Sequence, residues 1–174
     1  MKDFRNIDYL KIGNQKQIQA FKVLTEKKIL MNLAEFYPVL VGTIPINIDI
    51  ETSDLDIICY WIDKMVFTEK IQSNFNNEDK FIIRDTFINN QETVIASFET
   101  AGFKIEIFGQ NIPVREQNGY RHMITEYEIL QSKGENFRRE IIKLKQQGYK
   151  TEPAFGLLLG LKGDPYSALL DYKI

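Results

Sequence analysis

The sequence has little of what secreted and membrane proteins depend on. Its 174 residues include one cysteine, Cys59, so no disulfide can form within the chain. It contains no Asn-X-Ser/Thr glycosylation sequence, and no apolar run approaches the roughly 20 residues of a membrane-spanning helix. The first residues, Met1 to Arg5, are polar and lack signal-peptide character. These absences favour a cytoplasmic protein without a membrane partner.

An excess of charge of one sign is also missing. The chain has 22 Lys and Arg residues against 24 Asp and Glu, which gives a net charge of -2. Proteins that bind polynucleotides usually carry a basic excess. The charge balance therefore argues against nucleic acid as a partner. The single histidine, His122, is interpreted as a structural or surface residue, with a place on the wall of a cleft as the alternative.

Apolar and aromatic residues are plentiful, at 44% hydrophobic content with 12 Phe and 8 Tyr. This is enough for the core of one domain, with or without a small subdomain. Between Gln15 and Phe36 apolar residues recur at three- and four-residue steps, which predicts a helix. Residues 39–41 are typical of a short buried strand. Residues 44–51 alternate between isoleucine and mainly polar residues, which predicts extended chain.

The rest of the chain divides into a sheet and a helical tail. Strand patterns dominate up to Phe108, and helical patterns follow Pro113. The predicted fold class is therefore α+β: a mixed or antiparallel β-sheet with N-terminal helices in residues 1–112, and a C-terminal helical subdomain packed on it in residues 113–174. The predicted elements are a strand at 55–61, a helix at 67–75, an antiparallel meander at 81–108, and helices at 117–132, 135–147, 152–160 and 164–172.

Three acidic residues stand on predicted strands. Alternation places Asp54 and Asp56 on one face of their strand, about 7 Å apart, with Leu55 on the other face. Glu106 is flanked by apolar residues in the same way. If the two strands are neighbours, three carboxylates share one rim, and their like charges need a cation between them. Oxygen ligands suit Mg²⁺, and a two-metal phosphoryl-transfer site needs such a rim.

This pattern resembles the nucleotidyltransferase superfamily, which includes DNA polymerase beta and the antibiotic nucleotidyltransferases. The signature of that superfamily is a strand ending in Gly-Gly or Gly-Ser, a spacer, an Asp-hydrophobic-Asp strand and a later acidic residue on another strand. The matching segments are Val41-Gly42-Thr43, Asp54-Leu55-Asp56-Ile57 and Ile105-Glu106-Ile107. The helical tail, with Arg121-His122-Met123 and Gly163-Asp164-Pro165-Tyr166, resembles a bacterial family of unknown function within the same superfamily.

The resemblance implies an activity and a role for each matching residue. It implies transfer of a nucleoside monophosphate from a nucleoside triphosphate to a hydroxyl of a small molecule or protein, with Mg²⁺ or Mn²⁺ as cofactor. Asp54, Asp56 and Glu106 would be the metal ligands and catalytic residues, and Glu106 would also help to deprotonate the acceptor. Gly42, Thr43 and Ser53 would bind the nucleotide, Gly42 because the backbone must approach the phosphates closely.

Other interpretations stay open. No Lys or Arg lies between Gly42 and Lys64, although sites of this chemistry generally hold the triphosphate with cationic side chains. A non-catalytic protein of the same fold that binds a nucleotide or metal is therefore an alternative, and a component of a toxin–antitoxin pair is a third. Asp54 and Asp56 could also be a solvated strand start, and Glu106 an outward residue. The basic residues at 138, 139, 143 and 145 are predicted to form a solvated helix face.

Overall fold

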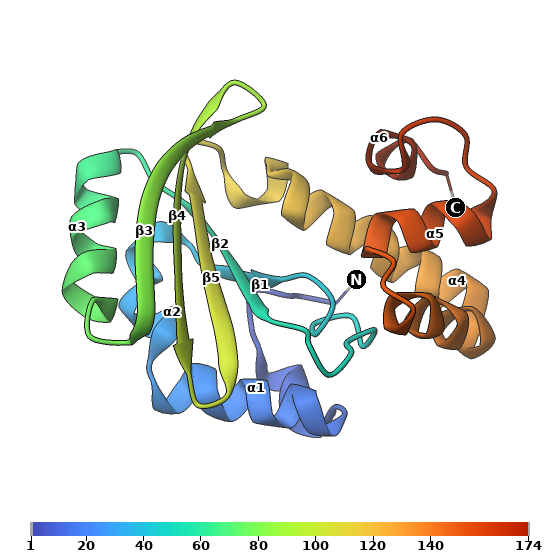
Figure 1. The fold of residues 1–174 in the computed structure, drawn as a ribbon, viewed down its shortest axis with the longest axis horizontal. Coiled ribbons are helices and arrows are strands. Elements are labelled where there is room, and N and C mark those ends of the chain that lie inside the picture. The colour runs from blue at the N-terminus through green and yellow to red at the C-terminus, as the bar shows by residue number, and fades with distance from the viewer. Residues whose placement is uncertain (1, 174) are drawn as a thin grey trace.

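The fold is built on one mixed five-stranded sheet, seen in a computed structural model that describes residues 2–173. The strand order is β1-β2-β5-β4-β3; β2 and β5 are parallel, and every other neighbouring pair is antiparallel (Figure 1). The predicted α+β class and the predicted meander are confirmed. The strands are β1 (Val39–Val41), β2 (Leu55–Tyr60), β3 (Asp79–Ile88), β4 (Gln91–Thr100) and β5 (Phe103–Gln110).

Helices precede, interrupt and follow the sheet. The predicted helix from Gln15 to Phe36 is broken, because Lys28 adopts a left-handed conformation (φ 55°). The long C-terminal helix is bent at Gly134, whose φ of 79° is not helical, close to the predicted stop. The α-helices are α1 (Gln15–Glu26), α2 (Ile29–Asn32), α3 (Lys64–Phe75), α4 (Asn118–Gln146), α5 (Thr151–Leu159) and α6 (Pro165–Leu170), and the 3-10 helices are η1 (Asp8–Ile12), η2 (Ala34–Phe36) and η3 (Val114–Glu116).

Residues 43–48 are not extended, which corrects the strand-like prediction for 44–51. They form tight turns: the Ile48 amide donates to the Thr43 carbonyl over 3.1 Å, and Asn47 has a φ of 60°. The alternating isoleucines are buried, but on two sides. Ile44 packs with the N-terminal helices, whereas Ile46 and Ile48 pack with the C-terminal helices. A turn between two cores thus produces the same alternation as a half-buried strand.

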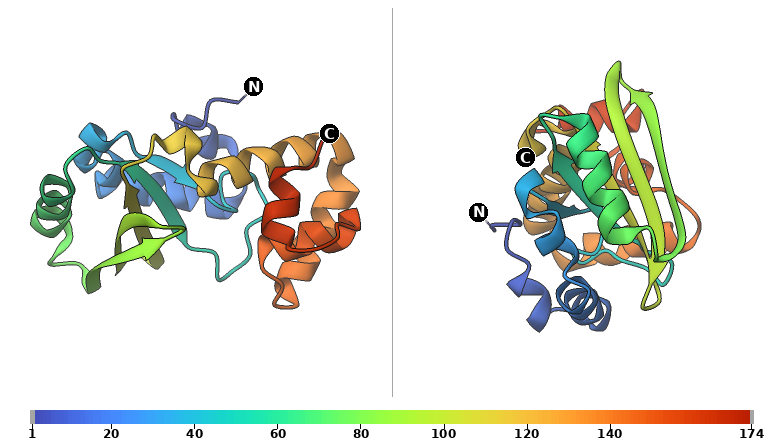
Figure 2. Two further views of the ribbon diagram at one scale, coloured as in Figure 1. Left: turned by 90° about the horizontal axis from the view of Figure 1, so that it is seen from above. Right: turned by 90° about the vertical axis from the view of Figure 1, so that its left-hand side faces the viewer.

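Two hydrophobic cores cover the sheet. The α1–α3 core joins those helices to one face, which carries Leu55, Ile57 and Ile107. The α4–α6 core joins the C-terminal helices to β1 and to Ile58, which points to the other face. Figures 1 and 2 show α3 and the pair α5–α6 at opposite ends of the molecule. The C-terminal helices cover this second face at Ile58 and partly at Phe108, whereas Asp56, Ser97 and Glu106 on the same face, here called the open face, are only partly buried.

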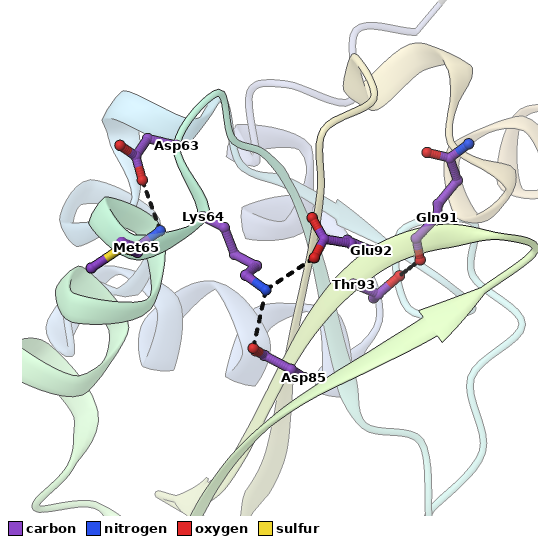
Figure 3. Close-up of polar contacts among 7 residues, drawn as sticks. All are labelled: Asp63, Lys64, Met65, Asp85, Gln91, Glu92 and Thr93. Carbon is purple, nitrogen blue, oxygen red and sulfur yellow. Dashed lines mark hydrogen bonds and ion pairs between the residues drawn. The ribbon is translucent and has the colours of Figure 1, made fainter.

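A polar group at the surface ties α3 to the β3–β4 hairpin (Figure 3). Lys64 forms ion pairs of 3.2 Å with both Asp85 and Glu92, and Asp63 caps α3 by accepting from the Met65 amide over 2.8 Å. Asp85 lies in register with Val94, Gly109 and Cys59, on the face that packs against α1–α3. These contacts support the fold and lie away from the open face. None of the described helices is both long and apolar enough to cross a membrane.

Candidate functional site

The parallel pairing of β2 and β5 brings two predicted site residues together. Asp56 lies directly beside Glu106 in the register, at the spacing of about 4.8 Å between neighbouring strands. Asp54 precedes β2 by one residue and is only partly buried, like the other two acids. Leu55 and Ile105, between and beside them, are fully buried in the α1–α3 core. The three acids, here called the acidic rim, therefore gather at the start of β2 on the open face.

Gly42 lies against this rim. It follows β1 with a φ of +83°, and a Cβ atom in its place would lie 2.7 Å from Oδ2 of Asp56. A side chain here would both strain the backbone and meet the carboxylate, so only glycine fits. The close approach exposes a stretch of backbone next to Asp56. The resemblance to nucleotidyltransferases implied that Gly42 belongs to the same site as Asp56.

Thr43 and Ser53 meet beside Gly42. Their hydroxyl oxygens are 3.1 Å apart, and the Ser53 oxygen also accepts a hydrogen bond from the Ile50 amide over 2.9 Å. Ser53 thus closes the turn that delivers Asp54 to the start of β2. All six predicted site residues are brought to one region of the open face.

The pKa of Asp56 shows the effect of placing three carboxylates close together in a partly buried site. Burial first, and then the negative charges of Asp54 and Glu106, raise the pKa of Asp56 to about 7. Lys104 and Lys145 oppose this rise, and the Lys104 ammonium lies 4.0 Å from Oδ2 of Asp54. Like charge thus contributes to the raised pKa of Asp56, although burial is the larger cause. A cation bound here would relieve both effects.

The rim is more open than a site for a single ion. Within residues 2–173, its oxygens do not all lie within 4.8 Å of one another. The three carboxylates would therefore have to rotate towards one another to hold the same ion.

Sequence reasoning missed two basic residues near the rim. Arg138 and Lys145 of α4 were predicted to be solvated, but they are only 9% and 7% exposed. They donate to the backbone of the 43–48 turn: Arg138 Nη1 to the carbonyls of Ile46 (2.5 Å) and Asn47 (3.1 Å), and Lys145 Nζ to that of Ile48 (2.8 Å). A signal was present, because Ile141 lies between them at helical spacing and the three residues form an inward stripe.

Ser97 is a second residue that the sequence did not single out. It lies on β4 directly beside Glu106, in a row that runs across the sheet from Val41 through Asp56. It is partly buried and polar on the open face. Only the register of β4 on β5 reveals this placement.

Solved structures with a similar fold are nucleotidyltransferases. The Cid1 poly(U) polymerase with MgGTP has a TM-score of 0.59 and 11% identity, over 84% of this chain and 50% of that chain. A cytoplasmic RNA terminal U-transferase has a TM-score of 0.54 and 13% identity, over 84% and 48%. The GLD-2/RNP-8 complex has a TM-score of 0.51 and 15% identity, over 87% and 60%. The chain thus spans about half the length of the first two, and the likeness establishes a nucleotidyltransferase-like fold.

Comparison by sequence gives the family. No curated protein is similar to this chain. Residues 22–172, which include the rim and all three C-terminal α-helices, match one family along their length. The chain belongs to the family described as "Domain of unknown function (DUF4269)".

Proposed function

We propose that the protein is a nucleotidyltransferase that moves a nucleoside monophosphate from a nucleoside triphosphate to an acceptor hydroxyl. The observation that carries the proposal is the register of Asp56 on Glu106, with Gly42 against Asp56. Three carboxylates and an approachable stretch of backbone on an open face are what phosphoryl transfer requires. The similarity in fold to a UTP-selective polymerase adds support.

The proposed reaction is a substitution at the α-phosphorus. The acceptor oxygen forms a bond to phosphorus, the bond from phosphorus to the bridging oxygen breaks, and pyrophosphate leaves with that electron pair. The acceptor proton passes to the Glu106 carboxylate. The backbone at Gly42 and the Thr43 hydroxyl hold the phosphates in line, so the protein contributes positioning and charge.

The residues of the rim fit Mg²⁺ or Mn²⁺. The donor set is entirely carboxylate oxygen, which hard divalent ions prefer. The pKa of Asp56 is raised first by burial and then by the charges of Asp54 and Glu106, and a bound cation would offset both causes. Asp54, Asp56 and Glu106 would hold the ions, whose chemistry would be to offset the charge of the triphosphate and to polarise the α-phosphate.

The acceptor class is broader than composition indicated. The balanced net charge argued against nucleic acid, but the proteins of similar fold include a poly(U) polymerase and an RNA terminal U-transferase. That expectation is not supported, so RNA joins small molecules and proteins as a proposed acceptor. The helices α4–α6 would form the wall of the cleft that selects among them.

Pyrophosphate release tests the proposal. Chelator-treated protein would be given Mg²⁺ or Mn²⁺ and each of the four NTPs, with short RNA, candidate small hydroxyl compounds or the protein itself as acceptor. We expect release with one NTP preferred, and loss of at least about 100-fold in Asp56→Asn, a reduction typical for removal of a transition-state stabilising group. Release that is unchanged in Asp56→Asn would overturn the assignment of the rim.

Gly42 provides a matched test of the phosphate-binding backbone. Gly42→Ala adds a methyl group against Asp56, whereas Gly102→Ala has nearly the same φ (+80°) with nothing within 4 Å. Both variants incur backbone strain of about 1–3 kcal/mol. We expect only Gly42→Ala to lose the thermal shift that the protein shows with an NTP and Mg²⁺. Equal loss in both variants would mean that the effect comes from strain alone.

The alternative function is a nucleotide- or metal-binding protein of this fold without transfer activity. The contacts of two lysines that act on the rim favour this alternative. Lys145 donates to the Ile48 carbonyl, and Lys104 lies beside Asp54. Fewer cationic groups then remain to hold a triphosphate. A thermal shift that requires Asp56 but is accompanied by no pyrophosphate release with any acceptor class would select this alternative.

A further inference from the structure

A second group of ligating side chains lies in the C-terminal helices, outside the acidic rim. His122 and Glu126 are one turn apart on α4, and Glu152 is in the first turn of α5. One ligand atom from each lies within 4.8 Å of the other two, and no other three His, Cys, Asp or Glu residues in residues 2–173 meet this closely. We call these three residues the C-terminal cluster. They lie where α4 and α5 meet, and none of them has a role in the proposed reaction.

The cluster is shielded from solvent and incompletely satisfied. His122 is 8% exposed and Glu126 is 3% exposed, while Glu152 is partly buried. Nδ1 of His122 is buried without a hydrogen-bond partner, although a buried polar atom is normally paired. The pKa of Glu126 is raised well above its ordinary value by burial and then by the charge of Glu152. Two carboxylates and an imidazole whose Nδ1 has no partner therefore converge in a shielded place.

An internal ion pair does not account for this arrangement. Glu152 influences His122 through its charge and not through a hydrogen bond. Burial lowers the pKa of His122, which favours the neutral imidazole, the form that coordinates metals. Lys145 offsets part of the charge of Glu126 but directs its ammonium to the Ile48 carbonyl, and Arg121, which acts on His122, donates to Asn118. A divalent cation would compensate both carboxylates and give the imidazole a partner.

We propose that His122, Glu126 and Glu152 bind a divalent transition-metal ion, with Zn²⁺ as the best match. One imidazole nitrogen with two carboxylates suits Zn²⁺, whereas Mg²⁺ prefers oxygen alone. Ligand atoms around a tetrahedral zinc ion lie about 3.4 Å apart at bond lengths of about 2.1 Å. The side chains reach this spacing by small rotations. The partial exposure of Glu152 leaves a fourth position for water.

The inference is independent of the proposed function, because none of its ligands belongs to the acidic rim. The ion would link α4 to α5, which are already in contact. It would also lie within reach of Lys145, whose pKa responds to Glu126 and Glu152 as well as to Asp54. A metal ion at the C-terminal cluster would thus change the electrostatic potential at Lys145, which donates to the turn beside the rim.

Calorimetric titration with ZnCl₂ tests the site. Chelator-stripped protein carrying Asp56→Asn would be used, so that binding at the rim is suppressed, and the circular dichroism of every variant would be recorded. We expect one Zn²⁺ to bind per chain, and we expect excess Mg²⁺ not to reduce this binding. We expect His122→Gln, Glu126→Gln and Glu152→Gln each to weaken binding by at least about tenfold, since even outer-shell partners of metals contribute about 10- to 100-fold.

A matched control lies on the same helix. Glu128→Gln removes a partly buried carboxylate two residues from Glu126 and outside the cluster, so Zn²⁺ affinity should be retained. Visible absorption of Co²⁺ in place of Zn²⁺ gives a spectroscopic signature that should disappear in His122→Gln. Glu152 is partly exposed, so Glu152→Gln keeps the test valid if a buried substitution unfolds the protein. No Zn²⁺ binding, or equal affinity in Glu152→Gln and Glu128→Gln, would overturn the inference.

Discussion

Asp56 combines two properties that rarely coincide in a carboxylate without a function. It is partly buried, and it lies close to two other acids, Glu106 on the neighbouring strand and Asp54 two residues before it. Both properties raise its pKa, so the folded protein binds a proton there more tightly than the unfolded chain does. Functional sites often hold such residues at a cost in stability. For Asp56 this cost depends on pH.

We predict that Asp56→Asn stabilises the metal-free protein at pH 8. With a pKa raised to about 7, Asp56 stabilises the fold fully below pH ~4 and progressively less as the pH rises to about 7. Asparagine carries no charge at any pH, so the difference between variant and parent should grow from pH 4 to 7 and then level off. The gain should be at most roughly 4 kcal/mol. Urea unfolding at several pH values measures it.

The control for this prediction is a carboxylate at the surface. Asp85 on β3 has a side chain that is 59% exposed, so Asp85→Asn has no buried charge to relieve. Its effect should be small at pH 8 and should not resemble that of Asp56→Asn. A stability difference for Asp56→Asn that is constant between pH 4 and 8 would contradict the prediction.

The sequence identified the residues of the rim but not their exact neighbours. Alternation around Leu55 and Ile105 assigned Asp56 and Glu106 to faces, because the side-chain period of a strand is fixed at two. Which residues face each other depends on the register of β2 on β5, which joins segments about 50 residues apart. Ser97 was missed for that reason, since only the pairing of β4 with β5 puts it beside Glu106.

At the scale of elements, the 43–48 turn depends on α4. The carbonyl groups of Ile46, Asn47 and Ile48 in the turn accept hydrogen bonds from side chains of α4. Arg138 donates to the first two and Lys145 to the third. The alternation of residues 44–51 could not reveal a turn, because it reports burial and not the direction in which each side chain is buried. The sequence alone could not distinguish Arg138 and Lys145 from solvated basic residues, because the carbonyl groups that accept their hydrogen bonds come from a distant segment.

We predict that Arg138→Leu destabilises the protein by about 1–3 kcal/mol, because it leaves the buried carbonyl of Ile46 and the partly buried hydrogen bond to the Asn47 carbonyl without their donor. The adjacent Arg139 is the control: it is exposed and bonds only to Asn136 within its own helix. Arg139→Leu should change stability by no more than about 0.5 kcal/mol. Urea midpoints compare the two.

The same pair of variants tests whether the turn supports ligand binding. Arg138→Leu should also reduce the thermal shift with NTP and Mg²⁺, since the turn continues directly from Gly42 and Thr43. Hydrogen exchange at the Ile48 amide, which donates to Thr43, should become faster. Equal stability of the Arg138 and Arg139 variants would show that water replaces the guanidinium at no cost.

At the scale of the molecule, the sheet belongs to both cores. The division predicted from sequence, 1–112 and 113–174, stays a prediction, and it does not describe how the two cores are shared. Ile46, Ile48 and Ile58 come from the first part of the chain and are buried with the C-terminal helices. Composition could identify these residues as core material, whereas their assignment to one core or the other requires the three-dimensional path of the chain.

We predict that the whole chain unfolds in one transition. Besides the shared core, Gln117 at the start of α4 is 2% exposed and donates to the carbonyls of Cys59 and Ile112, both over 2.8 Å. The only tryptophan, Trp61, is 4% exposed in the α1–α3 core, so its fluorescence reports on that side of the sheet. Far-UV circular dichroism is dominated by the helices, of which the 29-residue α4 is the longest.

The two signals should give the same urea midpoint and slope, because coincident transitions are the mark of a single cooperative unit. Arg138→Leu should shift both midpoints together, since it acts across the boundary between the two parts. If the C-terminal helices instead melted first, the helical signal would fall at lower urea than the Trp61 signal. That separation would mean that the α4–α6 core is a distinct unit whose contact with the sheet contributes little to its stability.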